Sequence, residues 1–431
     1  MAAEVHPPPL TTPPSSDRST SGESAPSRLT RGPRVQLPRR AMLLVPAGLG
    51  MLVGLDAGLL LAELPAPVTA DRLPEIHGMV MVLGFLGTLI ALERAIALRR
   101  SWAYAAPALL GAGGLALAVP GLPAWLGQLL LLDGAIAVTA VYAVLWRRQR
   151  DVPTVVQVVA AGMATMAALL WLRVDVERIV PLLLVFLVLT IASERVELAR
   201  LSLPASADRV LLTAALALAS AAVVSLVVPV WAGRAIGLGL CALVVWLARH
   251  DVARHTISSR GLPRFAAAAM LMGYAWLFVA GLVWLGVGDP VGAAAGAPTG
   301  QSSGHVADHS AGLAWLSGSA AYDLVIHAVT LGFVMSMVLA HAPVILPAVL
   351  RRPLPFHPVL WGVLGLLHAS LLARVVLGDL AGLTTPWRVG TSGTVVALLV
   401  FPPVIAWAVA RRPVASRPLA RRPVASGRHT E

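Results

Sequence analysis

The sequence predicts an all-α, polytopic membrane protein with about twelve transmembrane helices in one bundle. Of the 431 residues, 57% are hydrophobic and 13% are charged, about half the charged fraction of an average soluble domain. Apolar runs of about twenty residues, the length of a helix that spans a bilayer, recur along the chain. The one cysteine, Cys241, lies inside such a run, which excludes a disulfide framework and argues against a cysteine-based metal site.

Two tails flank the apolar region. Residues 1–40 are rich in Pro, Ser, Thr and Arg, a composition that predicts a disordered basic tail. Residues 411–431 predict a second one, in which RRPVAS occurs twice. Positive charge suits the anionic cytoplasmic leaflet. We therefore place both tails in the cytoplasm and the transmembrane domain at 41–410.

The apolar runs give the spans in order. We predict them at residues 41–63, 76–98, 102–120, 123–146, 154–172, 178–200, 210–229, 233–249, 264–287, 323–350, 357–378 and 389–410. The third contains the glycine-rich sequence GAGG at 111–114, and the eighth is short.

The segment 288–322, between the ninth and tenth spans, is the one long loop. It contains Gly, Ala and Ser but no arginine, and we interpret it as a flexible outer linker. Metal binding by His305, Asp308 and His309 is the alternative, which would require this loop to fold into a helix.

The distribution of arginine predicts the orientation of the bundle. All 33 basic residues are arginine, and they are more frequent in the loops on the side of the two tails, for example at Arg147 and Arg148. The opposite side has fewer, among them Arg173 and Arg374. Because cytoplasmic loops are enriched in arginine, an even number of spans with both ends inside fits this pattern.

Spans two and six share a sequence pattern. FLGTLIALERAIALRR (85–100) aligns with FLVLTIASERVELARL (186–201), and the tenth span fits the pattern through Phe333 and His341, eight residues apart. These three spans lie four apart and run in the same direction, so an internal repeat would arrange the helices as three groups of four. We interpret the Glu–Arg pairs in the two aligned segments, Glu93–Arg94 and Glu194–Arg195, as anchoring ion pairs near the inner interface.

Two histidines lie at the same predicted depth, near the outer ends of spans two and ten. These are His77 and His327. Two imidazoles from different membrane helices are the arrangement that ligates a haem axially, and the small residues Gly78 and Ala328 beside them would let a flat macrocycle approach. Asp323, one turn before His327, is placed to accept the other ring N–H. The alternative is a pair of hydrated structural histidines.

Three further histidines lie on spans ten and eleven: His341, His357 and His368. They could form a site for copper or a second cofactor, but their depths differ by up to about 16 Å at the rise of a helix. Polar packing or a proton relay is the alternative. His341 lies about 21 Å along the helix from His327, so we expect that it is not a haem ligand.

Two acids lie within predicted spans, Asp56 in the first and Asp133 in the fourth. Charges at such depth are costly and usually face a cavity or a partner. They are candidates for a proton or ion path. The alternative is a protonated, hydrogen-bonded acid that packs between helices.

The segments IHGMVMVLGF (76–85) and IHAVTLGFVMSMVLAHAPVILP (326–347) resemble the NnrS family of haem- and copper-containing membrane proteins linked to nitric-oxide stress. More distantly, twelve helices with a histidine on the second and tenth are similar to subunit I of the haem–copper oxidases. Both resemblances imply that His77 and His327 are the axial ligands of a haem.

The sequence departs from these families at two places. Glu75 stands where NnrS-like proteins usually have a second histidine, and residues 178–230 contain none of the histidines that the oxidase copper site needs. We therefore do not expect a binuclear centre that reduces oxygen or nitric oxide.

The sequence thus predicts a haem-binding protein, of b type, in the cytoplasmic membrane of a bacterium, with a role in electron transfer or nitric-oxide chemistry. Whether it is an enzyme stays open, and copper is a second candidate cofactor. Expected partners are the lipid bilayer and a redox donor or quinol, with no nucleic acid. The alternatives are a secondary transporter with Asp56 and Asp133 on its ion path, and a membrane scaffold without a cofactor.

We predict that reporter fusions to residues 1–40 and 411–431 will be cytoplasmic, and that a fusion within 288–322 will be on the outside. The arginine asymmetry is the physical reason. Paired alkaline phosphatase and fluorescent-protein fusions measure it, and a tail found outside would contradict the topology.

Overall fold

The computed structural model describes residues 39–200, 202–295, 318–350 and 356–410. Within these ranges the chain is helical and has no strands. The two tails lie outside the described residues. So does most of the long loop, including His305, Asp308 and His309.

Twelve of the described helices are long and apolar enough to cross a membrane, which confirms the predicted number of spans. In order they are α1 (Leu44–Leu61), α2–η2–α3 (Arg72–Met79, Val80–Gly87 and Thr88–Leu98), η3–α4 (Ser101–Tyr104 and Ala105–Ala118), α5 (Ala124–Gln149), α6 (Val152–Leu170), α7 (Val176–Leu198), α8 (Ala207–Val224), α9 (Pro229–His250), α11 (Leu262–Val287), α13–η4–α14 (Gly318–His327, Ala328–Val334 and Met335–Leu350), α15–η5 (Val359–Leu372 and Ala373–Leu380) and α16 (Thr384–Ala410). The short helices η1 (Arg39–Leu43), α10 (Ala253–Thr256) and α12 (Pro290–Ala295) lie between them or at their ends.

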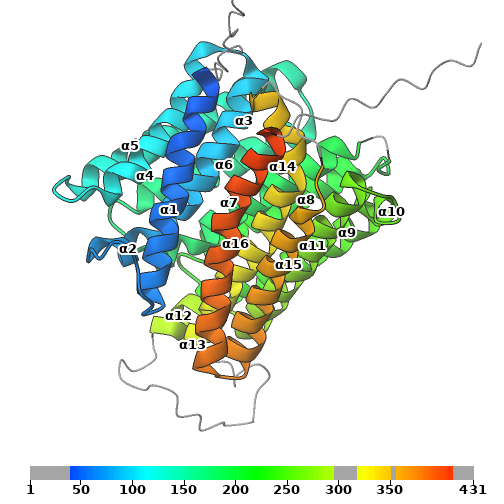
Figure 1. Cartoon of the computed structure of the whole chain (residues 1–431). Helices are drawn as coiled ribbons and strands as arrows, with labels where there is room; N and C mark the ends of the chain where they lie inside the picture. The colour runs from blue at the N-terminus through cyan, green and yellow to red at the C-terminus, as the bar shows by residue number, and fades with distance from the viewer. Residues whose placement is uncertain (1–38, 201, 296–317, 351–355, 411–431) are drawn as a thin grey trace, which may run out of the picture. The chain divides into compact units, whose positions relative to one another are not determined.

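The first and last spans place the two ends of the bundle on one side. Figure 1 shows the start of α1 and the end of α16 at the same edge, and α12 and α13 at the opposite edge. We call these the terminal side and the far side. The predicted orientation would make the terminal side cytoplasmic.

The structure corrects the extent of the predicted outer linker. Residues 290–295 form α12, which packs against α13, and the tenth span begins at Gly318 and not at 323. Residues 290–295 and 318–322 of the segment 288–322 are therefore helical, and α12 and α13 pack against each other on the far side.

The second, sixth and tenth spans are the most deeply buried. In their apolar windows 67%, 83% and 72% of the residues are buried, against at most 56% in any other described span. These spans also touch one another, because α7 contacts both α2 and η4, and α3 contacts α14. Three spans that lie four apart in sequence therefore form the centre.

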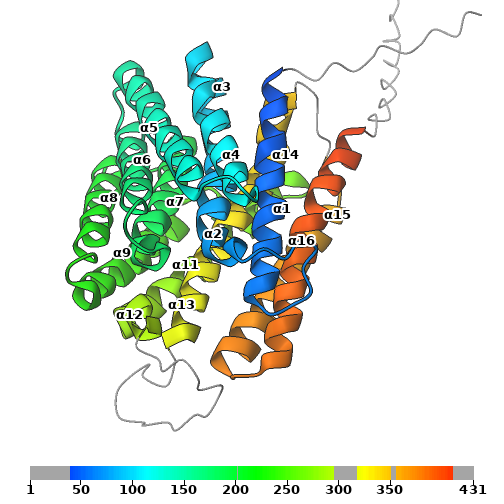
Figure 2. The same cartoon turned by 90° about the vertical axis from the view of Figure 1, so that its left-hand side faces the viewer.

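The other helices pack around this centre mostly beside their neighbours in the chain. The three groups of four stay a prediction, because α5 on α6 and α9 on α11 pack across the group boundaries as closely as helices within a group. Spans one to four pack together, as do spans five to eight and nine to twelve. The groups meet where α5 packs on α6, α9 on α11 and α1 on α16. In Figure 2, α6, α8 and α9 lie on one side of the bundle and α15 and α16 on the other.

Three of the described segments, η2, η4 and η5, are π-helical. A π-helix is wider than an α-helix and is often found at functional sites. The first two contain the same tripeptide, Leu-Gly-Phe, at 83–85 and 331–333. The central spans of the first and third groups thus share a local distortion as well as a sequence pattern.

Each of these two segments contains a glycine carbonyl that accepts a second hydrogen bond. The Thr88 hydroxyl donates to the Gly84 carbonyl oxygen at 2.7 Å, and the Ser336 hydroxyl donates to that of Gly332 at 2.5 Å. Within a bilayer, water does not satisfy such backbone groups. The hydroxyl one turn later serves that purpose in both spans.

The glycines of the predicted third span explain why its apolar pattern is interrupted. A Cβ atom on Gly113 would lie 2.9 Å from the backbone nitrogen of Leu131, and one on Gly114 would lie 2.9 Å from the Cα atom of Gly84. These glycines let α4 approach α5 and η2 with backbone against backbone, as small residues do between membrane helices.

We predict that Gly114→Ala will destabilise the bundle by about 1–3 kcal/mol, because its Cβ meets backbone atoms that must move. The measurement is the fraction of protein that stays monodisperse in detergent after heating. Gly162→Ala is the matched control, since nothing lies within 4 Å of its Cβ position. It is expected to be neutral, or stabilising by at most about 1 kcal/mol. Equal losses in both variants would contradict the close approach.

Candidate functional site

On the far side, His77 of α2 is anchored through one ring nitrogen. Its Nδ1–H donates to the Gly54 carbonyl oxygen of α1 at 2.8 Å, since a carbonyl can only accept. Gly58, one turn further along α1, lies against the ring: a Cβ atom there would be 3.1 Å from Cε1. Among the described residues, Nε2 of His77 has no hydrogen-bond partner.

His327, at the end of α13, is anchored in the same way. Its Nδ1 lies 2.8 Å from the Asp323 carbonyl oxygen and 3.1 Å from the Oδ1 atom of the same residue. The predicted contact between Asp323 and His327 is therefore confirmed. Nε2 of His327 also lacks a hydrogen-bond partner in the described part of the chain.

Asp323 has a second partner that the sequence did not indicate. Arg374 of η5 donates to both carboxylate oxygens of Asp323, at 2.9 and 2.7 Å. The same guanidinium donates to the Thr391 hydroxyl at 2.9 Å and lies 4.8 Å from the centre of the Trp387 ring. We counted Arg374 among the outer loop residues, but it is buried within the eleventh span.

Asp379, also in η5, is a further acid at this site. It interacts with Asp323 and with the Trp387 side chain. Its Oδ2 atom is buried and has no hydrogen-bond partner. Two carboxyl groups and one guanidinium thus lie together close to His327.

The two predicted histidines share this region, because His77 interacts electrostatically with His327, Arg374 and Asp323. The expected role of their small neighbours is not found. A Cβ on Gly78 would point at Val176 of α7, 3.3 Å away, and Ala328 is fully buried. The glycines beside His77 are Gly54 and Gly58 of α1.

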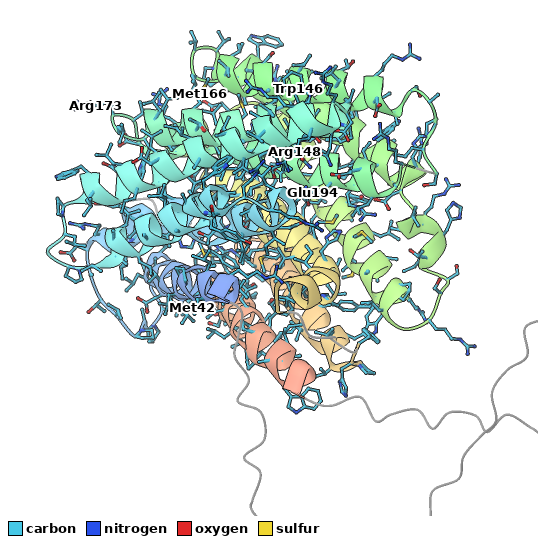
Figure 3. All side chains as sticks on the ribbon, turned by 90° about the horizontal axis from the view of Figure 1, so that it is seen from above. Met42, Trp146, Arg148, Met166, Arg173 and Glu194 are labelled. Carbon is cyan, nitrogen blue, oxygen red and sulfur yellow. The ribbon has the colours of Figure 1, made fainter. Side chains whose placement is uncertain are left out.

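A second cluster of polar groups lies near the terminal ends of the three central spans. Arg94 of α3 donates to Glu194 of α7 at 2.6 Å and contacts Glu93 at 3.3 Å. Figure 3, seen from the terminal side, shows Glu194 among the inner helices. The predicted ion pair at Glu93–Arg94 is present, and it is shared with the next group.

The predicted pair Glu194–Arg195 is wrong, because Arg195 pairs with a different acid. Its guanidinium donates twice to Asp251, at 2.8 Å each, and the Tyr274 hydroxyl donates to the same carboxylate at 2.6 Å. Asp251 lies in the loop after α9. Burial raises the pKa of its carboxyl, but the hydrogen bonds and charge of Arg195 outweigh burial and hold the pKa below its usual range.

His341 joins this cluster from the tenth span. Its Nδ1–H donates to the Met337 carbonyl oxygen at 2.7 Å, and Nη1 of Arg195 lies 3.2 Å from Nε2. Since Arg195 can only donate, Nε2 acts as the acceptor and the ring is neutral in this arrangement. Both ring nitrogens of His341 are thus used within the protein.

The other two candidate metal ligands have partners of their own. Trp276 donates to Nδ1 of His368 at 3.0 Å, and Nε2 lies 3.1 Å from the Ser336 hydroxyl. The His357 ring lies edge-on to Trp407 at 4.7 Å. The structure does not bring these histidines together with His341. Among the described residues, no group of three or more His, Cys, Asp or Glu could hold a metal ion.

Asp56 and Asp133 do not lie together either. Asp56 is buried near the far end of α1 and accepts a hydrogen bond from the backbone N–H of Val68 at 3.1 Å. It therefore holds the loop after α1. Asp133 is exposed on the surface of α5.

Sequence reasoning missed Arg374, Asp379, Asp251 and Tyr274. Arg374 was detectable, because a charged residue inside an apolar segment is a signal by itself. Because the predicted end of span eleven lies only four residues later, we assigned Arg374 to the outer side of the membrane. Asp251 gave no signal, since it lies in a polar loop and becomes buried only through the packing of α7 and α11.

We predict that Asp251→Asn will lower the stability in detergent by about 3–5 kcal/mol, because it leaves the buried Arg195 charge without its counter-ion. Asp208→Asn is the control. Its contact with Arg200 is 3.9 Å long and exposed, so the loss should stay below about 1 kcal/mol.

The pH dependence has a definite sign. The lowered pKa of Asp251 means that its stabilisation is present at neutral pH and is lost as the pH falls through that pKa. The difference between the wild type and Asp251→Asn should therefore shrink in acid. Thermal unfolding at several pH values measures it, and a difference that grew in acid would contradict the assignment.

The comparisons with known proteins give a family for the chain. No curated protein and no solved structure matches it. A family model described as "Domain of unknown function (DUF8744)" matches residues 40–410, which include every span of the bundle. The chain therefore belongs to the DUF8744 family.

Proposed function

We propose that this protein binds a haem of b type between its second and tenth spans, with His77 and His327 as axial ligands. The proposed role is electron transfer or nitric-oxide chemistry in the cytoplasmic membrane of a bacterium. The observation that carries the proposal is that both imidazoles, in one region, are anchored through Nδ1 and leave Nε2 free.

The chemistry of the two rings fits such a group. When Nδ1–H donates to an oxygen, the lone pair of Nε2 is available, and this is the form in which histidine ligates iron. Two neutral imidazoles from different helices are an axial ligand set for a membrane haem. When bound, the haem would supply a one-electron redox centre within the bilayer.

Asp323 supports this ligand set as a positioning residue. Its carbonyl and carboxylate oxygens both lie within 3.1 Å of Nδ1 of His327. Its carboxylate is itself held by two hydrogen bonds from Arg374. A carboxylate behind a ligating histidine fixes the tautomer and makes the ligand more basic.

The backbone around the two histidines also supports the proposal. The π-helical segment η4 starts directly after His327, and η2 starts three residues after His77. Such segments are rare and are often found at functional sites. The proposal is limited to haem, since no candidate copper site of three or more ligands is found among the described residues.

The rival class is a secondary transporter that uses Asp56 and Asp133. These acids lie in separate environments, one buried against a loop and one exposed on α5. No observation in the described chain links them into a path, whereas the two histidines interact with each other. A transporter or a scaffold without a cofactor would show no visible absorption, whereas the proposed haem protein would.

We expect purified protein reconstituted with haem to show a low-spin b-type absorption spectrum that His77→Ala and His327→Ala each abolish. Insertion into the membrane should persist in both variants, because it follows hydrophobicity. His341→Ala is the matched control: it lies on the same span as His327, but its Nε2 already contacts Arg195. It should keep the spectrum.

Two outcomes would overturn the assignment. In the first, the His77→Ala and His327→Ala variants keep the full spectrum while gel filtration shows folded protein. In the second, His341→Ala loses the spectrum while His327→Ala keeps it, which would move the ligand to the terminal side.

A further inference from the structure

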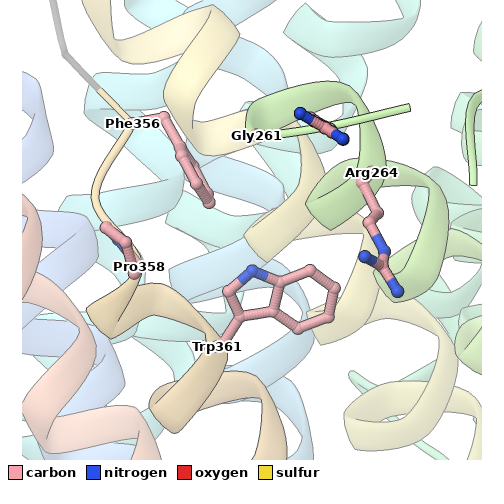
Figure 4. Close-up of a pocket in the computed structure, with 6 residues that line it drawn as sticks. Gly261, Arg264, Phe356, Pro358 and Trp361 are labelled. Carbon is pink, nitrogen blue, oxygen red and sulfur yellow. The ribbon is translucent and has the colours of Figure 1, made fainter. Parts of the chain in front are cut away.

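A pocket lies at the terminal side, where α11 and α15 begin. It has a volume of about 360 Å³ and is lined by Arg260, Gly261, Arg264, Phe356, Pro358 and Trp361. Figure 4 shows Phe356, Pro358 and Trp361 around one part of its opening and Arg264 across from them. It lies at the opposite side of the bundle from the histidine site, which is on the far side.

The pocket carries positive charge that no described group compensates. Arg260 and Arg264 are both exposed, and neither makes an ion pair or hydrogen bond with the described residues. No acidic side chain is among the lining residues. Elsewhere near this side, Arg94, Arg195 and Arg200 each contact a carboxylate. Two free arginines at one opening therefore attract an anion.

The turn between the two arginines places them at the start of a long helix. Gly261 has φ +67°, a left-handed conformation that favours glycine, and α11 begins at the next residue. The N-terminus of a helix carries partial positive charge. It adds to the charge of the arginines on either side of the turn.

The floor of the pocket is aromatic and firmly packed. The ring of Phe265, which is fully buried, lies 5.8 Å from that of Phe356 and 5.3 Å edge-on from that of Trp361. Trp361 itself is 38% exposed. The pocket thus joins a charged rim to an apolar surface that is built into the bundle.

The level of the pocket relative to the membrane indicates which anion it binds. α11 begins at Leu262 and α15 at Val359, so the lining residues lie at the ends of membrane spans, where the lipid headgroups are. Tryptophan is typical of this level. Basic pockets between helices at such a level bind anionic headgroups.

We propose that this pocket binds the headgroup of an anionic phospholipid. Arg260 and Arg264 contact its phosphate, and the exposed faces of Trp361 and Phe356 pack against its glycerol and upper acyl chains. A free phosphate ion would use the arginines but not the aromatic floor. The volume also suits a phosphate ester with attached groups, since it lies at the lower end of ordinary ligand pockets.

The test is native mass spectrometry of the full chain in detergent, titrated with phosphatidylglycerol or with phosphatidylcholine of the same acyl chains. We expect the wild type to bind phosphatidylglycerol more tightly than phosphatidylcholine. In the double variant Arg260→Gln/Arg264→Gln, that affinity should fall about ten-fold or more, because two charge-assisted contacts are lost. Trp361→Ala should weaken binding of both lipids.

A matched double variant, Arg147→Gln/Arg209→Gln, removes the same charge from exposed positions of this side outside the pocket. It should keep phosphatidylglycerol binding within about two-fold of the wild type. Equal losses in the two double variants would overturn the site in favour of diffuse charge attraction. An unchanged affinity in Arg260→Gln/Arg264→Gln would overturn it outright.

Inorganic phosphate is the remaining arm of the experiment. It should displace phosphatidylglycerol only at concentrations far above that of the lipid, because it cannot use the aromatic floor. If equimolar phosphate displaced the lipid, the pocket would be a site for a free phosphate ion and the lipid assignment would be wrong. Gel filtration of each variant confirms that it is folded.

Discussion

Polar groups inside this bundle have to find their partners within the protein, because the bilayer core supplies no water, and the few that lack one, such as Oδ2 of Asp379, are exceptions. This constraint explains most of the hydrogen bonds that polar side chains of the central spans make. Thr88, Thr190 and Ser336 each donate a hydroxyl hydrogen to the carbonyl four residues earlier. Two of these carbonyls belong to π-helical segments. The widened turns can persist in the membrane because a side chain of the same helix satisfies them.

The same constraint governs the charges. Arg94 and Arg195 lie one residue after aligned glutamates in spans two and six, and each contacts the next central span: Arg94 reaches Glu194, and Arg195 reaches His341. Without its acidic partner, Glu194 for Arg94 and Asp251 for Arg195, each arginine would be a buried, uncompensated charge, which costs several kcal/mol. The terminal-side cluster therefore fixes which helices are neighbours at the centre.

Four histidines of the bundle fall into two kinds, and the difference is in their hydrogen bonds. His341 and His368 use both ring nitrogens within the protein, so their rings are polar parts of the core. His77 and His327 use only Nδ1. A free Nε2 in a region shared by two helices is what a metal-bound group requires, and this contrast supports a ligand role for one pair and a structural role for the other.

The sequence by itself determined the class of the fold and the twelve spans to within a few residues. Both follow from hydrophobic length, which is a local property of each segment. It also predicted Asp323 behind His327, because residues four apart lie on one face of a helix. The equal depth of His77 and His327 was predicted from the positions of the two histidines near the outer ends of their spans.

Only the tertiary structure decided how the charged groups pair. Arg374 reaches Asp323 across 51 positions of the chain, and Arg195 reaches Asp251 rather than the adjacent Glu194. The three histidines of spans ten and eleven share a stretch of sequence but have separate partners. Which side chains meet across helices depends on how each helix is rotated about its axis. That rotation is set by close contacts such as Gly84 against Gly114. Each contact joins two helices, so the sequence of one helix does not reveal it.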